Sequence, residues 1–400
     1  MSLPSHSNKP LYFIYLILVV VASLAMGVYK SLEISVSYRE ALLYFSTPET
    51  LLDRCLLQAL HAFVRLAYFL PKDLALRLPG LSFHALNIIL IYLLSLKEKP
   101  QKPYDPLFVA LTFGLLPGVQ LGAILLGKAS LLITLSLLSL LAYRTWLFYV
   151  LSLLVALLDA SYVVLLTGFF LYAFKHKQMT HMLILFLALW INLYAFKSVS
   201  GTPQGFFLNT LFTMLILYSP CLCIYYPYAL YTQAIKEYKQ DSLIGVVGAV
   251  GFLLPLLLSL RQELPPEFLS YGPLGMPILL QKALSSIRLH LPIFRSHYYI
   301  RYSLVFGTLL LESMFLWGGY NKFVSTHYVA KELALALHKR GIETINTTSP
   351  RIALRLRFYG INSGGNLFLI EQSKHATIKI YYKNKVAASY AILRKKPLMP

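Results

Sequence analysis

Arg39 and Glu40 form a charged pair directly after the first long apolar run, within the stretch ISVSYREALLYF of residues 34–45. A carboxylate at such a boundary can take a proton from an approaching hydroxyl, which is typically worth about 10²- to 10⁴-fold in rate. Glu40 is therefore the candidate general base, and Arg39 is a candidate to orient it. Alternatively, Glu40 pairs with Arg39 or with a lipid amine on a hydrated surface helix.

Three cations, Arg77, Lys128 and Arg261, are predicted at the outer edges of apolar segments. An ionised group near hydrocarbon is costly, about 2.5 to 3.5 kcal/mol at a helix centre, and it calls for a partner such as a phosphate or a carboxylate. These cations are candidate phosphate ligands, with Arg261 the leading one, and Gln262 and Tyr271 can add hydrogen bonds. The alternative for Arg261 is that its side chain simply reaches out to lipid headgroups.

Asp159 lies in an apolar stretch near an expected outer turn. A buried charge is a functional candidate, but a helix cap for the segment that starts at Ser161 is an equal alternative. His61, His84 and His297 are expected to be packed or interfacial, since no His and carboxylate spacing typical of a metal site occurs. We therefore assign no metal ligand and no certain cofactor.

Composition predicts the fold class. The chain has 400 residues, of which 57% are hydrophobic and only 13% charged, so a soluble fold could not bury its apolar surface. The run at 11–29 is long enough to span a bilayer, which takes roughly 20 residues. Further apolar segments lie at about 79–96, 106–126, 129–143, 146–158, 160–174, 181–199, 209–229, 242–260, 272–284 and 300–320. We expect an all-α polytopic membrane protein with about eleven spans, in which 146–174 is either two spans or one bent unit.

The loops indicate an orientation, because Lys and Arg concentrate on the cytoplasmic side. With a cytoplasmic N-terminus, the opposite short loops hold only Lys128, Lys197 and Arg261. The cytoplasmic loops then hold Lys9, Lys97, Lys99, Lys102, Arg144, Lys175, Lys177, Lys236, Lys239, Lys282, Arg288, Arg295 and Arg301. The loop at 30–78 and the tail after Tyr320 are accordingly predicted to lie outside the cytoplasm.

The first outer loop and the tail are predicted to form structures other than membrane spans. Residues 37–46 and 51–70 are expected to form short helices on the membrane surface that roof a cavity. In the tail, 327–340 is predicted to be an amphipathic helix, and 352–361, 366–371, 376–383 and 386–393 are predicted strands of a small α+β domain. The tail carries fourteen Lys or Arg against Glu332, Glu343 and Glu371, which favours anionic lipid over nucleic acid as its partner outside the cytoplasm.

The order of these elements resembles the polytopic glycosyltransferases that use lipid-phosphate sugars, the GT-C fold, in particular protein O-mannosyltransferases and lipid A aminoarabinose transferases. The resemblance rests on SYREALLYF, on LRLP at residues 76–79, and on residues 56–96, 149–174 and 252–280, and it covers about residues 10–320. In that family an Asp-Glu pair follows the first span, and the first acid is usually catalytic. Here Arg39 occupies its place, and Lys128 stands where a second Asp often opens the fourth span. Either Glu40 has taken over the acid's role, or the enzyme is unusual or inactive.

The resemblance implies a domain at 1–320, with surface helices at 30–78, and an extracytoplasmic domain at 321–400. It implies a hexosyl- or pentosyltransferase of the bacterial inner membrane. The donor would be a polyprenyl-phosphate-linked sugar, and the acceptor a glycolipid, a glycan or a protein at the periplasmic face. A divalent metal is compatible with the family but has no support in these residues. The alternatives are a transporter or flippase of a lipid-linked or anionic substrate, and a non-catalytic relative of the family.

Overall fold

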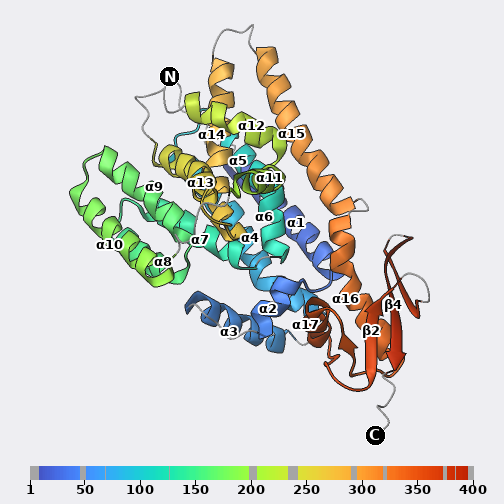
Figure 1. Ribbon diagram of the computed structural model, residues 1–400. Helices are drawn as coiled ribbons and strands as arrows, with labels where there is room; N and C mark the ends of the chain where they lie inside the picture. Colours follow the sequence, from blue (N-terminus) through green and yellow to red (C-terminus); the bar gives the residue numbers. More distant parts are fainter. Residues whose placement is uncertain are drawn as a thin grey trace.

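The computed structural model describes residues 9–45, 51–67, 69–125, 127–197, 205–232, 242–289, 295–318, 322–372, 376–382 and 384–394. The chain is mainly helical, with a small sheet near the C-terminus (Figure 1). The first helices are α1 (Lys9–Glu33), α2 (Tyr38–Phe45), α3 (Leu51–Leu66), α4 (Lys72–Lys97), α5 (Asp105–Leu115), α6 (Pro117–Leu125) and α7 (Gly127–Ala142). They are followed by α8 (Leu147–Leu158), α9 (Tyr162–Lys175), α10 (Met179–Phe196), α11 (Phe207–Tyr218), α12 (Pro220–Tyr231), α13 (Leu243–Ser259), η3 (Pro266–Tyr271), α14 (Gly272–Leu289) and α15 (Arg295–Gly318).

Each apolar segment of the sequence coincides with one helix or with one bent pair of helices. Four described helices, α1, α4, α10 and α15, are long and apolar enough to cross a membrane. The number rises to six if each bent pair, α5 with α6 and α11 with α12, is one span. The helices α7, α8, α9 and α13 are apolar but shorter, so the expected number of about eleven spans stays a prediction.

The two bent pairs break at prolines. A residue before proline is pushed out of helical conformation, and Leu116, which precedes Pro117, has an extended ψ of 123°. Ser219 before Pro220 has a φ of +71°. The helices bend by 58° at the first break and by 99° at the second. The breaks lie against each other, because a Cβ on Gly118 would be 2.8 Å from the carbonyl oxygen of Leu217.

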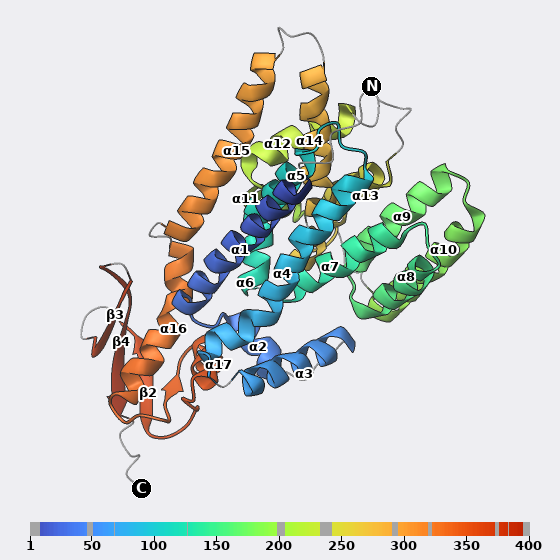
Figure 2. The same ribbon diagram turned by 180° about the vertical axis from the view of Figure 1, so that it is seen from behind.

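One end of the helical body carries α2, α3 and the C-terminal elements (Figures 1 and 2). The helix α3 lies across this end and contacts α4 and α8. The helices expected at 37–46 and 51–70 are thus present as α2 and as the shorter α3, and their position on a membrane surface stays a prediction. Leu56 and Leu60 of α3 are buried, whereas Arg54 is exposed, so one side of α3 packs on the body and the other faces outwards.

The C-terminal elements are α16 (Lys322–His338), β1 (Asn346–Thr347), α17 (Pro350–Phe358), β2 (Leu367–Glu371), β3 (Ile378–Tyr382) and β4 (Lys385–Arg394). The sheet has the order β1-β2-β4-β3, in which only the β1–β2 pair is parallel, and α16 packs on β3 and β4. The strands predicted at 366–371, 376–383 and 386–393 are confirmed. The strand predicted at 352–361 is wrong. Pro350 occupies the first turn of a helix there, a position for which its fixed φ is suited, and the alternation of Ile352, Leu354 and Leu356 was misleading.

Candidate functional site

Glu40 and Arg77 form a buried ion pair at the end of the helical body that carries α2 and α3. Arg77 Nε donates to Glu40 Oε1 at 2.8 Å, and Arg77 Nη2 donates to Oε2 at 3.0 Å. Their side chains are 1% and 9% exposed. This two-pronged geometry is the strong form of an Arg–carboxylate interaction. Glu40 therefore pairs with Arg77 of α4, and not with its neighbour Arg39, which is exposed.

The remaining N–H groups of Arg77 bind the backbone where α1 ends. Nη1 donates to the carbonyls of Ser31 and Ile34 at 3.1 and 2.7 Å, and Nη2 donates to that of Ser35 at 2.9 Å. The last carbonyls of a helix have no partner within the helix, and a cation beside them is favourable. All five N–H donors of the guanidinium are used in this way. None is left for a phosphate, so phosphate binding by Arg77, which stays a prediction, would require the ion pair to open.

Glu40 also closes the N-terminus of α2. The backbone N–H of Ser37 donates to Glu40 Oε2 at 2.7 Å, and the backbone N–H of Glu40 donates to Ser37 Oγ at 3.2 Å. This reciprocal arrangement is a capping box, in which two otherwise unpaired N–H groups are satisfied. Both carboxylate oxygens of Glu40 thus accept hydrogen bonds. Catalysis by Glu40 stays a prediction, but the contacts are those of a structural carboxylate.

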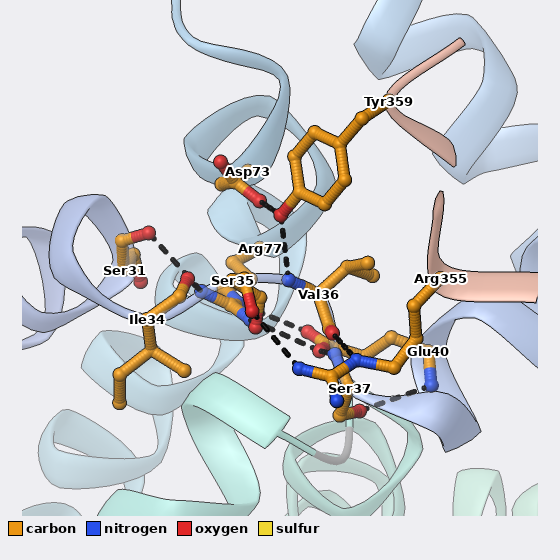
Figure 3. A network of polar contacts seen from close by, with 10 residues as sticks. All are labelled: Ser31, Ile34, Ser35, Val36, Ser37, Glu40, Asp73, Arg77, Arg355 and Tyr359. Atoms are coloured by element: carbon orange, nitrogen blue, oxygen red, sulfur yellow. Dashed lines mark hydrogen bonds and ion pairs between the residues drawn. The ribbon is translucent and has the colours of Figure 1, made fainter. Parts of the chain in front are cut away.

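The C-terminal domain completes this network (Figure 3). Arg355 of α17 donates to the carbonyl of Val36 at 2.8 Å and to Ser35 Oγ at 3.0 Å. The hydroxyl of Tyr359 donates to Asp73 Oδ1 at 2.5 Å and accepts from the N–H of Val36 at 2.8 Å. Burial, with the nearby charge of Asp73, raises the pKa of the Tyr359 phenol, so it stays a donor; burial lowers the pKa of the Arg355 guanidinium.

A second network centres on Lys128, at the start of α7. Its Nζ lies 3.0 Å from Asp53 Oδ1 and 2.5 Å from Asp159 Oδ2. Asp53 comes from α3 and Asp159 follows α8, so this ammonium group joins three elements. The side chains of Lys128 and Asp53 are 19% and 18% exposed, and that of Asp159 is 9% exposed. Unlike Glu40, Asp53 is therefore a carboxylate that solvent or a ligand can reach.

Asp159 connects Lys128 to Tyr271. Its Oδ1 accepts from the N–H and the hydroxyl of Ser161 at 2.9 and 2.6 Å. Ser161 Oγ lies 2.9 Å from the hydroxyl of Tyr271 in η3. One side chain thus serves two partners, because Oδ1 binds the turn before α9 while Oδ2 pairs with a cation, and a functional role for Asp159 stays a prediction. We call Asp53, Lys128, Asp159, Ser161 and Tyr271 the Lys128 cluster.

The two networks are neighbours. Leu131, one turn after Lys128, packs against an apolar cluster that contains Val36, Ala41 and Leu76. Ala41 follows Glu40 and Leu76 precedes Arg77, so the side chains that flank the ion pair belong to the cluster on which the helix with Lys128 packs. A change at the ion pair is therefore expected to reach the Lys128 cluster through this packing.

Arg261 and Gln262 lie in the turn after α13, where their backbone N–H groups bond to the carbonyl of Leu258. Arg261 is exposed. The role of Arg261 and Gln262 in phosphate binding stays a prediction.

The described residues contain no group of three or more His, Cys, Asp or Glu side chains that could hold a metal ion. The ammonium group of Lys128 lies between the two carboxylates of the Lys128 cluster, where a bound metal ion would otherwise have to sit. The electrostatics of the cluster are therefore those of an ion-pair site.

Sequence reasoning identified Lys128, Asp159 and Tyr271 separately but missed Asp53 and Ser161. It also missed the residues that close the Glu40 network, namely Ser37, Asp73, Arg355 and Tyr359. One signal was present in the sequence, because Ser37 and Glu40 have the S-x-x-E spacing of a capping box. The others are brought together only by tertiary contacts.

No family model matches the chain, and a search of curated proteins found no match. The chemistry of the site must therefore be inferred from its own residues.

Replacement of Glu40 by Gln should destabilise the protein, because it leaves the buried Arg77 without its counter-charge. Loss of one partner of a buried pair typically costs about 3 kcal/mol or more. We expect a lower Tm in detergent, measured by intrinsic fluorescence. The matched control is Arg39→Ala on the exposed side of the same helix, which should change the free energy of unfolding by no more than about 0.5 kcal/mol. Equal Tm values for the two variants would contradict a structural role for the ion pair.

Proposed function

We propose that the protein is a membrane glycosyltransferase that moves a sugar from a polyprenyl-phosphate donor to an acceptor hydroxyl or phosphate at the outer face of a membrane. The observation that supports this proposal best is the Lys128 cluster. It combines a reachable carboxylate, Asp53, with a cation, Lys128, at the end of the body that α3 covers. Group transfer from a lipid phosphate requires one group of each kind.

The proposed step uses these residues as follows. Asp53 accepts the proton of the acceptor as its oxygen bonds to the anomeric carbon of the sugar. The bond from that carbon to the phosphate oxygen breaks, and its electron pair goes to the phosphate. Lys128 stabilises the developing charge, which is most effective where water is excluded. An arriving phosphate competes with Asp53 for Lys128, so donor binding itself would weaken the ion pair of Asp53 as the reaction begins.

Other members of the cluster act as positioning groups in this proposal. Asp159 holds the ammonium group of Lys128 from the buried side, and Ser161 joins Asp159 to Tyr271. The Glu40–Arg77 pair fixes the end of α1 and the start of α2, which in turn contacts α3. The acid of the site thus comes from α3 and not from the Arg39-Glu40 pair.

The proposal includes a membrane orientation. We place α2, α3 and the C-terminal domain on the periplasmic side of a bacterial inner membrane and the N-terminus in the cytoplasm. The four long apolar helices support membrane insertion, and the Lys and Arg distribution of the loops supports the direction. The acceptor would be a glycolipid, a glycan or a protein.

A transporter is the second candidate, because broken helices are typical of transporter binding sites. The breaks before Pro117 and Pro220 lie side by side, and Ser219 Oγ at the second break donates to Glu312 Oε1 of α15 at 2.8 Å. A transporter would move substrate across sealed vesicles without consuming a sugar lipid.

The orientation predicts the labelling of the exposed Cys55 on α3. In a variant with Cys221→Ser and Cys223→Ser, a membrane-impermeant maleimide should label Cys55 in intact spheroplasts. The control is Lys99→Cys with all three native cysteines replaced by serine, which should react only after the membrane is permeabilised. The reverse pattern would contradict the orientation.

The reaction predicts a sugar-modified product that depends on this protein. Mass spectrometry should compare the glycolipids, glycans and proteins of membranes with and without the protein. In the membranes that lack it, one of these products should be missing a sugar. Purified Asp53→Asn should lose activity by about 10²-fold or more, with its Tm close to that of the wild type because Asp53 is partly exposed.

The matched control is Cys55→Ser, an exposed change on the same helix, which should retain full activity. An unchanged sugar profile in membranes that lack the protein would contradict the transferase. Full activity of Asp53→Asn would contradict the assignment of the base.

A further inference from the structure

A wide cleft lies at the end of the body opposite to α2, α3 and the sheet. Its volume is about 850 Å³, and it opens between the last turns of α4, α7 and α9, the first turns of α10 and α13, and the side of α14 that carries Lys282. Binding sites for small molecules typically have volumes of about 300–1,000 Å³. The cleft is thus large enough for a lipid headgroup, and it shares no lining residue with the Lys128 cluster.

The charge of the cleft is strongly positive. Its lining includes Lys97, Lys99, Arg144 and Lys282, and Glu98 is its one carboxylate among the lining residues described. Glu98 pairs with Lys282 at 2.5 Å. Within the described part of the chain, Lys99 and Arg144 have no carboxylate partner. These two exposed cations therefore favour an anionic ligand.

The N-terminus of α13 adds to this field. Ser242, Leu243 and Ile244 line the cleft, and Ser242 Oγ donates to Glu98 Oε2 at 2.9 Å. The first N–H groups of a helix and its positive dipole end attract anions. The backbone N–H groups of α13 and the cationic side chains of the cleft thus both attract an anion.

Part of the cleft lining is apolar. Leu94, Leu140 and Ile244 are buried side chains that line it, beside the ring of Tyr143. The Tyr143 hydroxyl donates to Gln178 Oε1 at 2.7 Å, and the buried ring packs against those of Phe148 and His181. A lining that combines cations with apolar side chains suits an amphiphile better than a free inorganic ion.

We propose that this cleft binds a phosphate-bearing lipid headgroup of the adjoining leaflet. Lys99 and Arg144 contact the phosphate, the α13 N-terminus faces it, and the first part of the acyl chains lies on Leu94 and Leu140. Glu98 lowers the affinity of the cleft for the phosphate, because it forms an ion pair with Lys282 and its own negative charge repels the anion. The site is independent of the proposed transfer reaction, and it needs neither the donor nor the acceptor of that reaction.

The test is a titration of the full-length protein, in phosphatidylcholine nanodiscs, with dioctanoyl phosphatidic acid. We expect Lys99→Ala/Arg144→Ala to raise the Kd about tenfold or more, because each cation near a phosphate contributes substantially. Glu98→Gln should lower the Kd several-fold, and this gain of affinity cannot result from misfolding.

The matched control is Lys175→Ala/Lys177→Ala, which removes the same charge from the turn between α9 and α10, outside the lining of the cleft. It should leave the Kd unchanged. An equal rise of the Kd in the control would show a general charge effect and overturn the site. Equal affinity for inorganic pyrophosphate would overturn the lipid assignment, and an unchanged Kd for Glu98→Gln would overturn the role of the cleft.

Discussion

The guanidinium of Arg77 is the group on which the end of the helical body with α2, α3 and the C-terminal domain depends. It lies at the end of α1, is buried, and donates to one carboxylate and to three backbone carbonyls. Burial of an arginine without partners would cost several kcal/mol, so this position is stable only when all of these acceptors are in place. The path of the chain from Ser31 to Glu40 is therefore determined by one side chain from α4.

Two other parts of the structure are ordered around this segment. Glu40 begins α2 through its capping box, and α2 leads to α3, which brings Asp53 to Lys128. The C-terminal domain binds the same segment through Arg355 and Tyr359. A domain more than 300 residues away in sequence thus contacts the backbone beside the ion pair. Glu40, the predicted general base, is held in this framework by Arg77 and by the N–H of Ser37, while the more exposed carboxylate of Asp53 lies on the neighbouring helix.

Sequence patterns predicted the helices well, because apolar runs of more than about ten residues favour a helix over a strand. The breaks at Pro117 and Pro220 were not expected, although residues before proline leave helical conformation. In the tail, the alternation of residues 352–361 was interpreted as a strand, whereas Pro350 begins a helix. The periodicity of such short segments is too weak to distinguish a helix from a strand.

The site was predictable only in part. Lys128, Asp159 and Tyr271 stood out as polar residues at the ends of apolar segments, but their convergence depends on how α7, α8 and η3 pack. Asp53 was not distinguishable from other charges of an amphipathic helix. The pairing of Glu40 with Arg77 joins residues 37 positions apart, and the local neighbour Arg39 was the more obvious partner in the sequence.

Hydrogen exchange of the full-length protein in nanodiscs, comparing wild type with Arg77→Met, tests the central claim most directly. If Arg77 organises this end of the helical body, amides of residues 31–45 and of α17 should exchange at least about tenfold faster in the variant, while those of α9 and α10 should not change. Unchanged exchange in residues 31–45 would contradict the account.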